Sequence, residues 1–377
     1  MGIRLSLDLG ARCYGPLVAG TSGSSESATA VLGSNLLRSY GLGMLPLRYE
    51  QYNASAREGM LPETTLDVSI ISVDGDPPPA RGGHSAVTVE NQIIIFGGSS
   101  YVSGGKFAYY NDTRMLDTRN RLWHEMHCSG ETPAPRYGHS AELVGSRMFV
   151  WGGRGEAGTL QDISFLDLVE WTWISVSVTS ASPAPRFFHA SLLLGRKIVI
   201  HGGWDGHMQC MDDIWVFDSD TFTWLQPKCL GIAPTPRYGH SLDLLRDGRI
   251  LCCGGCTVSA KEPVPKYHND FRQLNTETMM WTKFSPNGNC IPSKRYGHAT
   301  VRSDRGIAIF GGWGIDGQQY SDFFFFLSDD QLLPCSPAGL SHKYGHTMNA
   351  IGRVLYVFGG WNGQQATSDL IQIQPTT

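Results

Sequence analysis

The stretch PRYGHSAELVGSRMFVWGG, residues 135–153, decides the fold because it recurs with variations along most of the chain. Each copy starts with a basic residue, has His three positions later, and ends in an apolar run that two glycines close. The glycine pairs are Gly97-Gly98, Gly152-Gly153, Gly202-Gly203, Gly254-Gly255, Gly311-Gly312 and Gly359-Gly360. Self-similarity at a period of about fifty residues is typical of repeat architectures, so the sequence predicts six units.

Further landmarks keep a fixed order within the units. A basic residue and a His precede each glycine pair, at Arg81 and His84, Arg136 and His139, Arg186 and His189, Arg237 and His240, Arg295 and His298, and Lys343 and His346. An Asp follows each pair, at Asp112, Asp162, Asp213, Asp270, Asp322 and Asp369. Eleven residues beyond the Asp, four units carry Trp123, Trp173, Trp224 and Trp281, and the fifth carries Leu333. The equal numbers of basic and acidic landmarks predict that they pair, which favours a structural role for both.

Each unit has the pattern of a small antiparallel sheet. In the first unit, apolar runs separated by turn residues predict strands at 85–89, 92–96, 114–117 and 122–127. A lone four-stranded sheet leaves both of its faces uncovered. The units are therefore expected to stack in a ring and to bury these faces against one another.

The last unit lacks its outer strand, because a position eleven residues beyond Asp369 lies past the end of the 377-residue chain. Val68 stands thirteen residues before Arg81, which is the offset that Trp123 keeps from the next basic landmark. The stretch 66–73 is therefore predicted to complete the last sheet and to close the ring.

The order Gly-Gly, Asp and Trp, framed by Pro-Arg-Tyr-Gly-His, resembles the kelch-repeat family of β-propellers over roughly residues 66 to 377. The resemblance implies an all-β, six-bladed kelch-type β-propeller with four antiparallel strands per blade and a ring closed by an N-terminal strand. We place the propeller at residues 61–377 and expect residues 1–60 to form a flexible or loosely docked N-terminal tail. The start of the chain matches a minimal myristoylation pattern, so a weak lipid anchor at Gly2, with Cys13 as a second acylation site, is kept as an alternative.

Composition argues against several classes of partner. The 30 Lys and Arg residues against 34 Asp and Glu give a net charge of −4, which supplies no field to attract nucleic acid or anionic lipid. No apolar run approaches the length of about eighteen residues that a membrane span needs, so no integral membrane contact is expected. The nine cysteines are odd in number and irregularly spaced, and several lie in apolar runs. This usage favours a reducing compartment and a cytoplasmic location.

The recurring Arg and His do not form a catalytic set, because an enzyme needs one constellation of unlike groups rather than six copies of one pair. Cys252, Cys253 and Cys256 contain one C-x-x-C spacing, but no second pair follows and the glycines of the repeat lie between them. His201 replaces the usual apolar residue before its glycine pair, whereas His207 and His268 fall in loops. We therefore predict no catalytic, cofactor-binding or metal-binding residues.

Two functional classes stay open. The preferred one is a non-catalytic protein-protein interaction module or scaffold. The alternative is a metal-dependent enzyme with a site at the channel mouth, similar to galactose oxidase or to plant specifier proteins, because a propeller brings distant residues together. The iron-binding Glu-x-x-x-Asp-x-x-x-His pattern of the specifier proteins fails here, since Glu262 is followed four residues later by Lys266.

Loops carry the stronger case for a binding function. In an antiparallel blade, the loop between the second and third strands emerges on the same face as the loop into the next blade. That face is expected to collect loops 99–111, 154–161, 204–211, 256–269, 313–321 and 361–367. Aromatic and Arg side chains on rigidly held loops are typical of protein-binding hot spots. The predicted partner-binding residues are Tyr101, Tyr109, Tyr110, Arg154, Trp204, His207, Tyr267, Trp313, Tyr320 and Trp361. For the three Trp residues, packing over the glycine pairs is an equally supported alternative.

Overall fold

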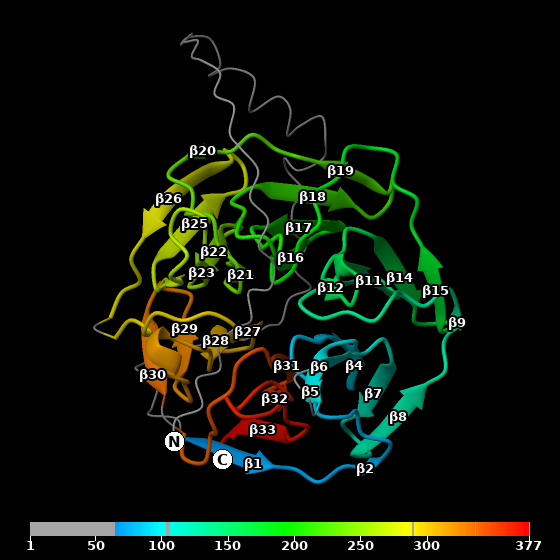
Figure 1. Cartoon of the computed structure of the whole chain (residues 1–377). Coiled ribbons are helices and arrows are strands. Elements are labelled where there is room, and N and C mark those ends of the chain that lie inside the picture. The colour runs from blue at the N-terminus through cyan, green and yellow to red at the C-terminus, as the bar shows by residue number, and fades with distance from the viewer. Residues whose placement is uncertain (1–64, 103–105, 289, 336, 377) are drawn as a thin grey trace.

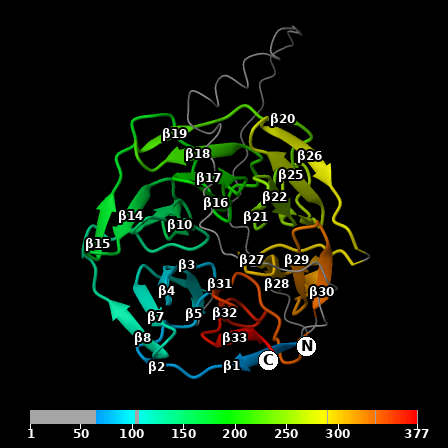
Figure 2. The same ribbon diagram turned by 180° about the vertical axis from the view of Figure 1, so that it is seen from behind.

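The computed structural model describes residues 65–376, except 103–105, 289 and 336. In this part of the chain, six antiparallel sheets stand around a central channel like the blades of a propeller (Figure 1 and Figure 2). The one helix among the described residues is the short 3-10 turn η1 (Ile315–Gly317), and no helix there is long and apolar enough to cross a membrane. The predicted six-bladed all-β propeller is confirmed. The expected tail, with Gly2 and Cys13, lies outside the described residues.

Each blade runs from an inner strand at the channel to an outer strand at the rim. The strands, blade by blade, are β3 (Ser85–Val89), β4 (Gln92–Phe96), β7 (Thr113–Asp117) and β8 (Leu122–Met126); β10 (Ser140–Val144), β11 (Arg147–Trp151), β14 (Ile163–Asp167) and β15 (Thr172–Ser175); β16 (Ala190–Leu194), β17 (Lys197–His201), β18 (Ile214–Asp218) and β19 (Thr223–Leu225); β21 (Ser241–Leu244), β22 (Ile250–Cys253), β25 (Phe271–Asn275) and β26 (Met280–Phe284); β27 (Ala299–Arg302), β28 (Ile307–Phe310), β29 (Phe323–Phe326) and β30 (Leu332–Cys335); and β31 (Thr347–Ile351), β32 (Val354–Phe358), β33 (Leu370–Pro375) and β1 (Leu66–Ile70). The four strands of the first blade lie within one residue of the predicted bounds.

Shorter strands complete the sheets and the loops. β2 (Asp74–Gly75), β9 (Ser129–Gly130) and β20 (Leu230–Gly231) pair in parallel with outer strands. Such short additions cover part of the outer edges, which would otherwise offer free hydrogen-bonding groups to another chain. The hairpins are β5 (Ser99–Val102) with β6 (Lys106–Tyr109), β12 (Arg154–Gly155) with β13 (Gly158–Thr159), and β23 (Cys256–Thr257) with β24 (Lys266–Tyr267).

The ring closes through the N-terminal strand, as predicted. β1 pairs antiparallel with β33, and Val68 stands opposite Ile373. This register gives Val68 the place that Trp123 occupies opposite Leu116 in the first blade. The last blade therefore combines the two ends of the propeller in one sheet, which ties its first and last blades together.

The prediction that Leu333 takes the Trp position of the fifth blade is wrong. Leu332 stands opposite Phe326 and is 2% exposed, whereas Leu333 is 37% exposed. Phe326 and Leu332 are six residues apart, whereas the equivalent pair of the first blade, Leu116 and Trp123, is seven residues apart, so counting from Asp322 overshoots the buried position by one.

The four Trp residues pack between neighbouring blades. Trp173 of the second blade lies 4.7 Å from Phe96 of the first, measured between ring centroids. Trp224 of the third blade lies 5.4 Å from Trp151 of the second. Aromatic pairs at such distances contribute to packing beyond their buried area, and they help to fix the angle between blades.

A buried basic side chain at the inner end of each blade pairs with the Asp of its own unit. The predicted pairing of the landmarks is observed in all six blades. In the first blade, Arg81 donates to both carboxylate oxygens of Asp112, at 2.7 and 2.9 Å, and to the carbonyl of Gly97 at 2.8 Å. Burial alone would raise the pKa of Asp270, but the hydrogen bonds and charge of Arg237 outweigh it and lower this pKa to about 2.

A ring of backbone hydrogen bonds joins the six blades around the channel. Each bond runs from an N–H two residues after the basic landmark to the same carbonyl of the neighbouring blade. Gly83 donates to Gly345, Gly138 to Gly83, Phe188 to Gly138, Gly239 to Phe188, Gly297 to Gly239, and Gly345 to Gly297, all at 2.7–2.8 Å. The residues adopt positive φ values, which suit Gly and are strained for Phe188 at 52°.

The glycine pair is required by the close approach of the next blade. At Gly202, φ is 65°, and a Cβ atom would lie 2.6 Å from the carbonyl oxygen of Arg237. The same carbonyl accepts a hydrogen bond from the Gly203 N–H at 2.8 Å. A side chain at this position would push the third and fourth blades apart.

The landmark His residues are buried and neutral. In the first three blades, His Nε2 lies 2.8 Å from a hydroxyl of the preceding blade, contributed by Thr347, Ser85 and Ser140 respectively. Burial lowers the pKa of His189 and of His298 to about 3, and it lowers the pKa of the other four landmark His residues well below the usual value.

We expect Arg295→Met to lower the free energy of unfolding by about 3 kcal/mol, because it leaves the Asp322 carboxylate and a buried carbonyl without their donor. Asp322 is 35% exposed, so water can hydrate its carboxylate in the variant. The loss of stability is therefore expected at the lower end of the range of about 3–5 kcal/mol that is typical for breaking a buried ion pair. Arg295→Lys should lose clearly less, since Lys343 pairs with Asp369 in the sixth blade at 2.7 Å. Urea unfolding measures both variants, and equal losses would contradict the pairing role.

Stability should fall steeply between pH 6.5 and 5.5. The pKa of each landmark His is depressed in the folded state, so the unfolded chain takes up protons below its pKa of about 6.5, and stability is lost as the pH falls. Each such His costs about 1.4 kcal/mol at pH 5.5. Burial raises the pKa of Glu142 to about 7 and of Asp243 to about 6, which acts in the opposite sense, but these groups are outnumbered.

Thermal melting across this pH range measures the effect. Glu142→Gln should make the fall of the melting temperature steeper, because it removes one opposing group. A melting temperature that stays constant or rises on acidification would contradict the assignment of neutral, buried His residues.

Candidate functional site

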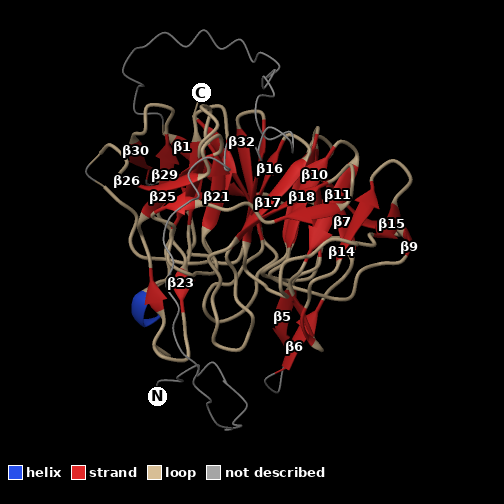
Figure 3. Cartoon of the chain, turned by 90° about the horizontal axis from the view of Figure 1, so that it is seen from above, coloured by secondary structure: helices blue, strands red, loops and turns tan. Residues whose placement is uncertain are grey.

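The loops predicted to share one face lie together on it. Figure 3 shows the β5–β6 hairpin, β23 and η1 projecting from the same side of the ring. These elements follow the second strand of the first, fourth and fifth blades. We call this side the loop face.

Aromatic residues meet the loops of the loop face, where backbone bridges join each of them to the residue after a glycine pair. They occupy the position after the basic landmark in five blades, as Tyr137, Phe187, Tyr238, Tyr296 and Tyr344. Ring centroids lie 5.7 Å apart for Tyr137 and Phe187, and 5.5 Å apart for Tyr238 and Tyr296. We call these five rings, with Trp204, Trp313 and Trp361, the aromatic belt.

The three predicted Trp residues are half-buried members of the belt. Trp204 lies 5.4 Å from Tyr238, and Trp313 lies 4.9 Å from Tyr344. The first blade has Gly82 at the belt position, and a Cβ atom there would meet the Trp361 indole at 2.0 Å. Gly82 therefore makes room for Trp361, and each Trp packs against an aromatic or glycine of the next blade.

The hairpin of the first blade extends the belt outward. Tyr101 and Phe107 are each 47% exposed, and their rings meet edge to face at 5.1 Å. Phe107 also lies 6.2 Å from Trp361, and the half-buried Tyr109 lies 5.7 Å from Tyr137. Exposed aromatic rings on a paired hairpin give a partner apolar area at low entropic cost.

Three further predicted residues lie at the edge of the belt. The guanidinium of Arg154 lies 5.5 Å from the Phe187 ring, and the Tyr267 ring lies 5.9 Å from Tyr296. His207 is exposed in a tight loop, where its backbone N–H donates to the Asp205 carboxylate at 2.7 Å.

Tyr110 and Tyr320 both stack against a buried basic landmark. The Arg81 guanidinium stacks 4.4 Å from the Tyr110 ring, and the Arg295 guanidinium stacks 4.2 Å from the Tyr320 ring. Tyr320 is 8% exposed and donates its hydroxyl to the carbonyl of Lys294 at 3.3 Å. Both rings support the buried basic landmarks, and Tyr320 presents little surface to a partner.

The belt is uncharged at neutral pH. Burial raises the pKa of Tyr137 and of Tyr344 to about 12, and burial with nearby Cys256 raises the pKa of Tyr267 to about 12. These phenols therefore keep their protons and serve as hydrogen-bond donors set in an apolar surface, which suits recognition of a protein chain.

The loops of the third and fourth blades are fixed by a small core of their own. Cys210, Tyr238, Cys256 and Val258 are buried together, with Trp204 and Tyr267 packed against them. The backbone N–H of Val258 donates to the Cys210 sulfur at 3.3 Å. None of the eight cysteines within the described ranges forms a disulfide, so packing and hydrogen bonds hold these loops.

The channel holds a polar cavity of about 410 Å³ between the inner strands. Glu142, Asp243 and Arg302 line it, together with the buried Ser241 and His298, whose side chains have no hydrogen-bond partner among the described residues. A narrower space of about 150 Å³ at the mouth is surrounded by the landmark His residues. The cavity offers room for water or a small polar molecule. Its two carboxyl groups belong to different blades, and that of Glu142 accepts a hydrogen bond from the Ser191 hydroxyl at 2.6 Å.

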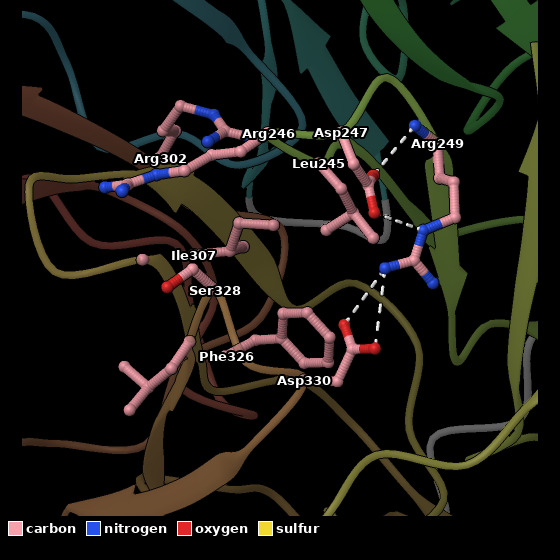
Figure 4. Close-up of a pocket in the computed structure, with 11 residues that line it drawn as sticks. Leu245, Arg246, Asp247, Arg249, Arg302, Ile307, Phe326, Ser328 and Asp330 are labelled. Carbon is pink, nitrogen blue, oxygen red and sulfur yellow. Dashed lines mark hydrogen bonds and ion pairs between the residues drawn. The ribbon is translucent and has the colours of Figure 1, made fainter.

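A second depression, of about 80 Å³, lies at the turns between the fourth and fifth blades, away from the loop face. Figure 4 shows that Arg249 bridges Asp247 and Asp330 across it, at 2.6 and 3.2 Å. The space is too small for a substrate, and the ion pairs identify it as a contact between blades.

Several residues of the loop face were not predicted from the sequence. Phe107 stands in a polar loop, and its signal was an aromatic residue between Lys106 and Tyr109 with strand-like alternation. The belt tyrosines belong to the repeat itself, so their recurrence alone does not mark them as part of a site. Only the ring geometry shows that they meet across blades.

The sequence matches the family model of the KLHDC2/KLHL20/DRC7 Kelch-repeats domain over residues 59–255, 99–312 and 266–377. It is 35% identical over 210 residues to the Rho GTPase-activating protein gacHH of Dictyostelium discoideum, which covers 55% of this chain and 10% of that protein. It is 24% identical over 255 residues to Kelch domain-containing protein 2 of Bos taurus, covering 67% of this chain and 53% of that protein. It is 28% identical over 292 residues to Host cell factor 1 of Homo sapiens, covering 69% of this chain and 14% of that protein. The matched region thus spans from a tenth to about half of the length of these relatives.

Proposed function

Since the chain belongs to the kelch-repeat family of β-propellers, we propose that it is a non-catalytic protein-interaction module or scaffold, with the loop face as its docking surface. Kelch-repeat relatives suggest a protein-interaction module. A propeller fold hosts many functions, so the docking surface has to be argued from its own residues.

The observation that carries the proposal is a series of aromatic ring contacts that leads from the exposed hairpin of the first blade to the half-buried Trp361. Phe107 links the exposed Tyr101 to Trp361, and hence the hairpin of the first blade to the belt. Hot spots of protein interfaces are enriched in Trp, Tyr and Arg and lie where the scaffold holds them in place. The proposed contact residues are Tyr101, Phe107, Tyr109, Arg154, Trp204, His207, Tyr267, Trp313 and Trp361.

The absence of catalysis is part of the proposal and rests on how the repeated polar residues are used. Each landmark Arg has its donors engaged by a carboxylate and by carbonyls, as Arg295 has with Asp322 and Gly311. The landmark His residues are buried and neutral, which leaves them without access to a large substrate. These residues stabilise the ring, so function falls to the loops.

We propose a protein partner, a cytoplasmic location, and a boundary near residue 61 between the propeller and the preceding segment. The first strand of the ring begins at Leu66, which supports that boundary. The net charge of −4 supports a protein rather than a nucleic acid as the partner.

Changing Tyr101, Phe107 and Arg154 together to Ala should abolish capture of the partner. Each hot-spot side chain typically contributes 2 kcal/mol or more to binding, so losing three weakens the affinity by several orders of magnitude. Stability should change little, because the two aromatic rings are about half exposed and none of the three is a landmark of the repeat. Affinity purification from lysate with mass spectrometry, followed by titration of the captured partner, measures the loss.

The matched control changes three exposed residues in the turns of the opposite face, Glu90, Arg119 and Arg246, to Ala. This variant should retain the partner. If the control loses the partner and the loop-face variant keeps it, the docking surface is the other face. If both variants keep it, the exposed rim at Leu230, Ile232 and Met280 becomes the surface to examine, and the proposal is wrong.

A further inference from the structure

The contact between the third and fourth blades departs from the repeat at several positions that meet in space. At most blade contacts, an apolar residue ends the second strand of the preceding blade, and its ring packs against the landmark His in four contacts, while the penultimate position of the second strand of the His's own blade is also apolar. The preceding-blade residues are Phe358, Phe96, Trp151, His201, Cys253 and Phe310 for the first to sixth blades. The own-strand residues are Ile95, Val150, Ile200, Cys252, Ile309 and Val357.

The contact between the third and fourth blades therefore brings two metal-binding side chains to the landmark His240. His201 comes from β17 of the third blade, and Cys252 comes from β22 of the fourth. In addition, Ala190 takes the place of the hydroxyl that holds the landmark His in the first three blades, which leaves His240 Nε2 free of that partner. The departures converge on one point between two blades.

The geometry at this point is that of a ligand cluster. A nitrogen of His201, a nitrogen of His240 and the Cys252 sulfur all lie within 4.8 Å of one another. His201 Nδ1 and His240 Nε2 are 2.9 Å apart, and the side chains are 0%, 6% and 0% exposed for His201, His240 and Cys252. This is the one group of three such ligands that the described part of the chain brings together.

The need to replace the missing hydroxyl as a hydrogen-bond partner of His240 does not by itself explain why His201 is present. The contact between the fifth and sixth blades also has Ala, at position 299, beside the landmark His346. There, Phe310 and Val357 fill the two neighbouring positions, and neither ring nitrogen of His346 has a partner. The fold thus tolerates a landmark His with apolar neighbours, and a buried imidazole and thiol at the equivalent contact need another reason.

We propose that His201, His240 and Cys252 form a buried site for a thiophilic closed-shell metal ion, Zn²⁺ or Cu⁺, that joins the third and fourth blades. Two imidazoles and one thiolate are the ligand types that such ions select. Metal–nitrogen bonds of about 2.0–2.1 Å at a tetrahedral angle require the two nitrogens to move apart by about 0.4 Å from their hydrogen-bond distance.

Binding replaces a proton without any redox change. The Cys252 S–H bond breaks, its proton leaves to water, and a sulfur–metal bond forms, while both imidazoles bind through lone pairs in their neutral state. Once bound, the cation lies beside the negative charge of the Cys252 thiolate.

The surrounding charges permit the ion. Arg186 and Arg237 lie near, but each is paired with its own carboxylate, Asp213 and Asp270. Because these pairs are each neutral overall, they impose no large net repulsion on a cation at the site. His240 also lines the channel cavity of about 410 Å³, which provides a route from solvent.

The test uses the full chain, stripped with a chelator and then exposed separately to Zn²⁺, to Cu⁺ under anaerobic reducing conditions, and to Co²⁺ as a spectroscopic probe. We expect one equivalent of Zn²⁺ or Cu⁺ to remain after dialysis, with a rise in melting temperature. The Co²⁺ form should show a thiolate-to-metal charge-transfer band. The ion that is retained and stabilises the fold distinguishes Zn²⁺ from Cu⁺.

The decisive variant is His201→Phe with Cys252→Val, which reproduces the side chains of the fifth-to-sixth blade contact and should fold. It should lose the retained ion, the rise in melting temperature and the charge-transfer band. If this double variant does not fold, Cys252→Val alone must remove the charge-transfer band. The control His342→Ala with Cys290→Ser changes an exposed His and an exposed Cys and should keep all three signals. Failure of the wild-type chain to retain either ion, or equal retention by the ligand variant, would overturn the proposal.

Discussion

The propeller depends on a buried basic side chain in each blade, which joins groups that would otherwise lie unpaired near the channel. Arg81 shows the arrangement: its guanidinium reaches Asp112, the carbonyl of Gly97 and the carbonyl of Pro79. The segment it anchors also supplies the N–H and carbonyl that link the blade to its neighbours in the closed hydrogen-bond ring. Because each buried charge is fully engaged, the repeat can keep six cations near the core.

This use of the repeat separates structure from function along the sequence. Landmarks that recur in every unit hold blades together, whereas residues that differ between units either sit in the loops or alter a single blade contact. The loop face and the contact between the third and fourth blades are the two places where such differences gather. At the first, Tyr101 and Phe107 extend the aromatic belt; at the second, His201 and Cys252 meet His240.

Much of the fold was predictable because its landmarks are local and periodic. The six blades, the closing strand at Val68 and the pairing of basic and acidic landmarks all follow from spacing. The fifth blade shows where prediction from spacing fails. Its paired residues Phe326 and Leu332 are one residue closer in sequence than the equivalent pair of the first blade, so the buried position is Leu332. The site was less predictable, because the belt and the His240 cluster join residues that are far apart in sequence and whose distances depend on the angle between blades.

Hydrogen exchange of the protein bound to its captured partner tests most directly whether the loop face is the docking surface. Amides of the β5–β6 hairpin and of the loops at 154–161 and 204–211 should gain protection on binding, because a partner seated on the loop face excludes water from them. The turns of the opposite face, including that between β21 and β22, should exchange as in the free protein. Protection confined to those turns or to the outer strands at the rim, with the loops unchanged, would contradict the account.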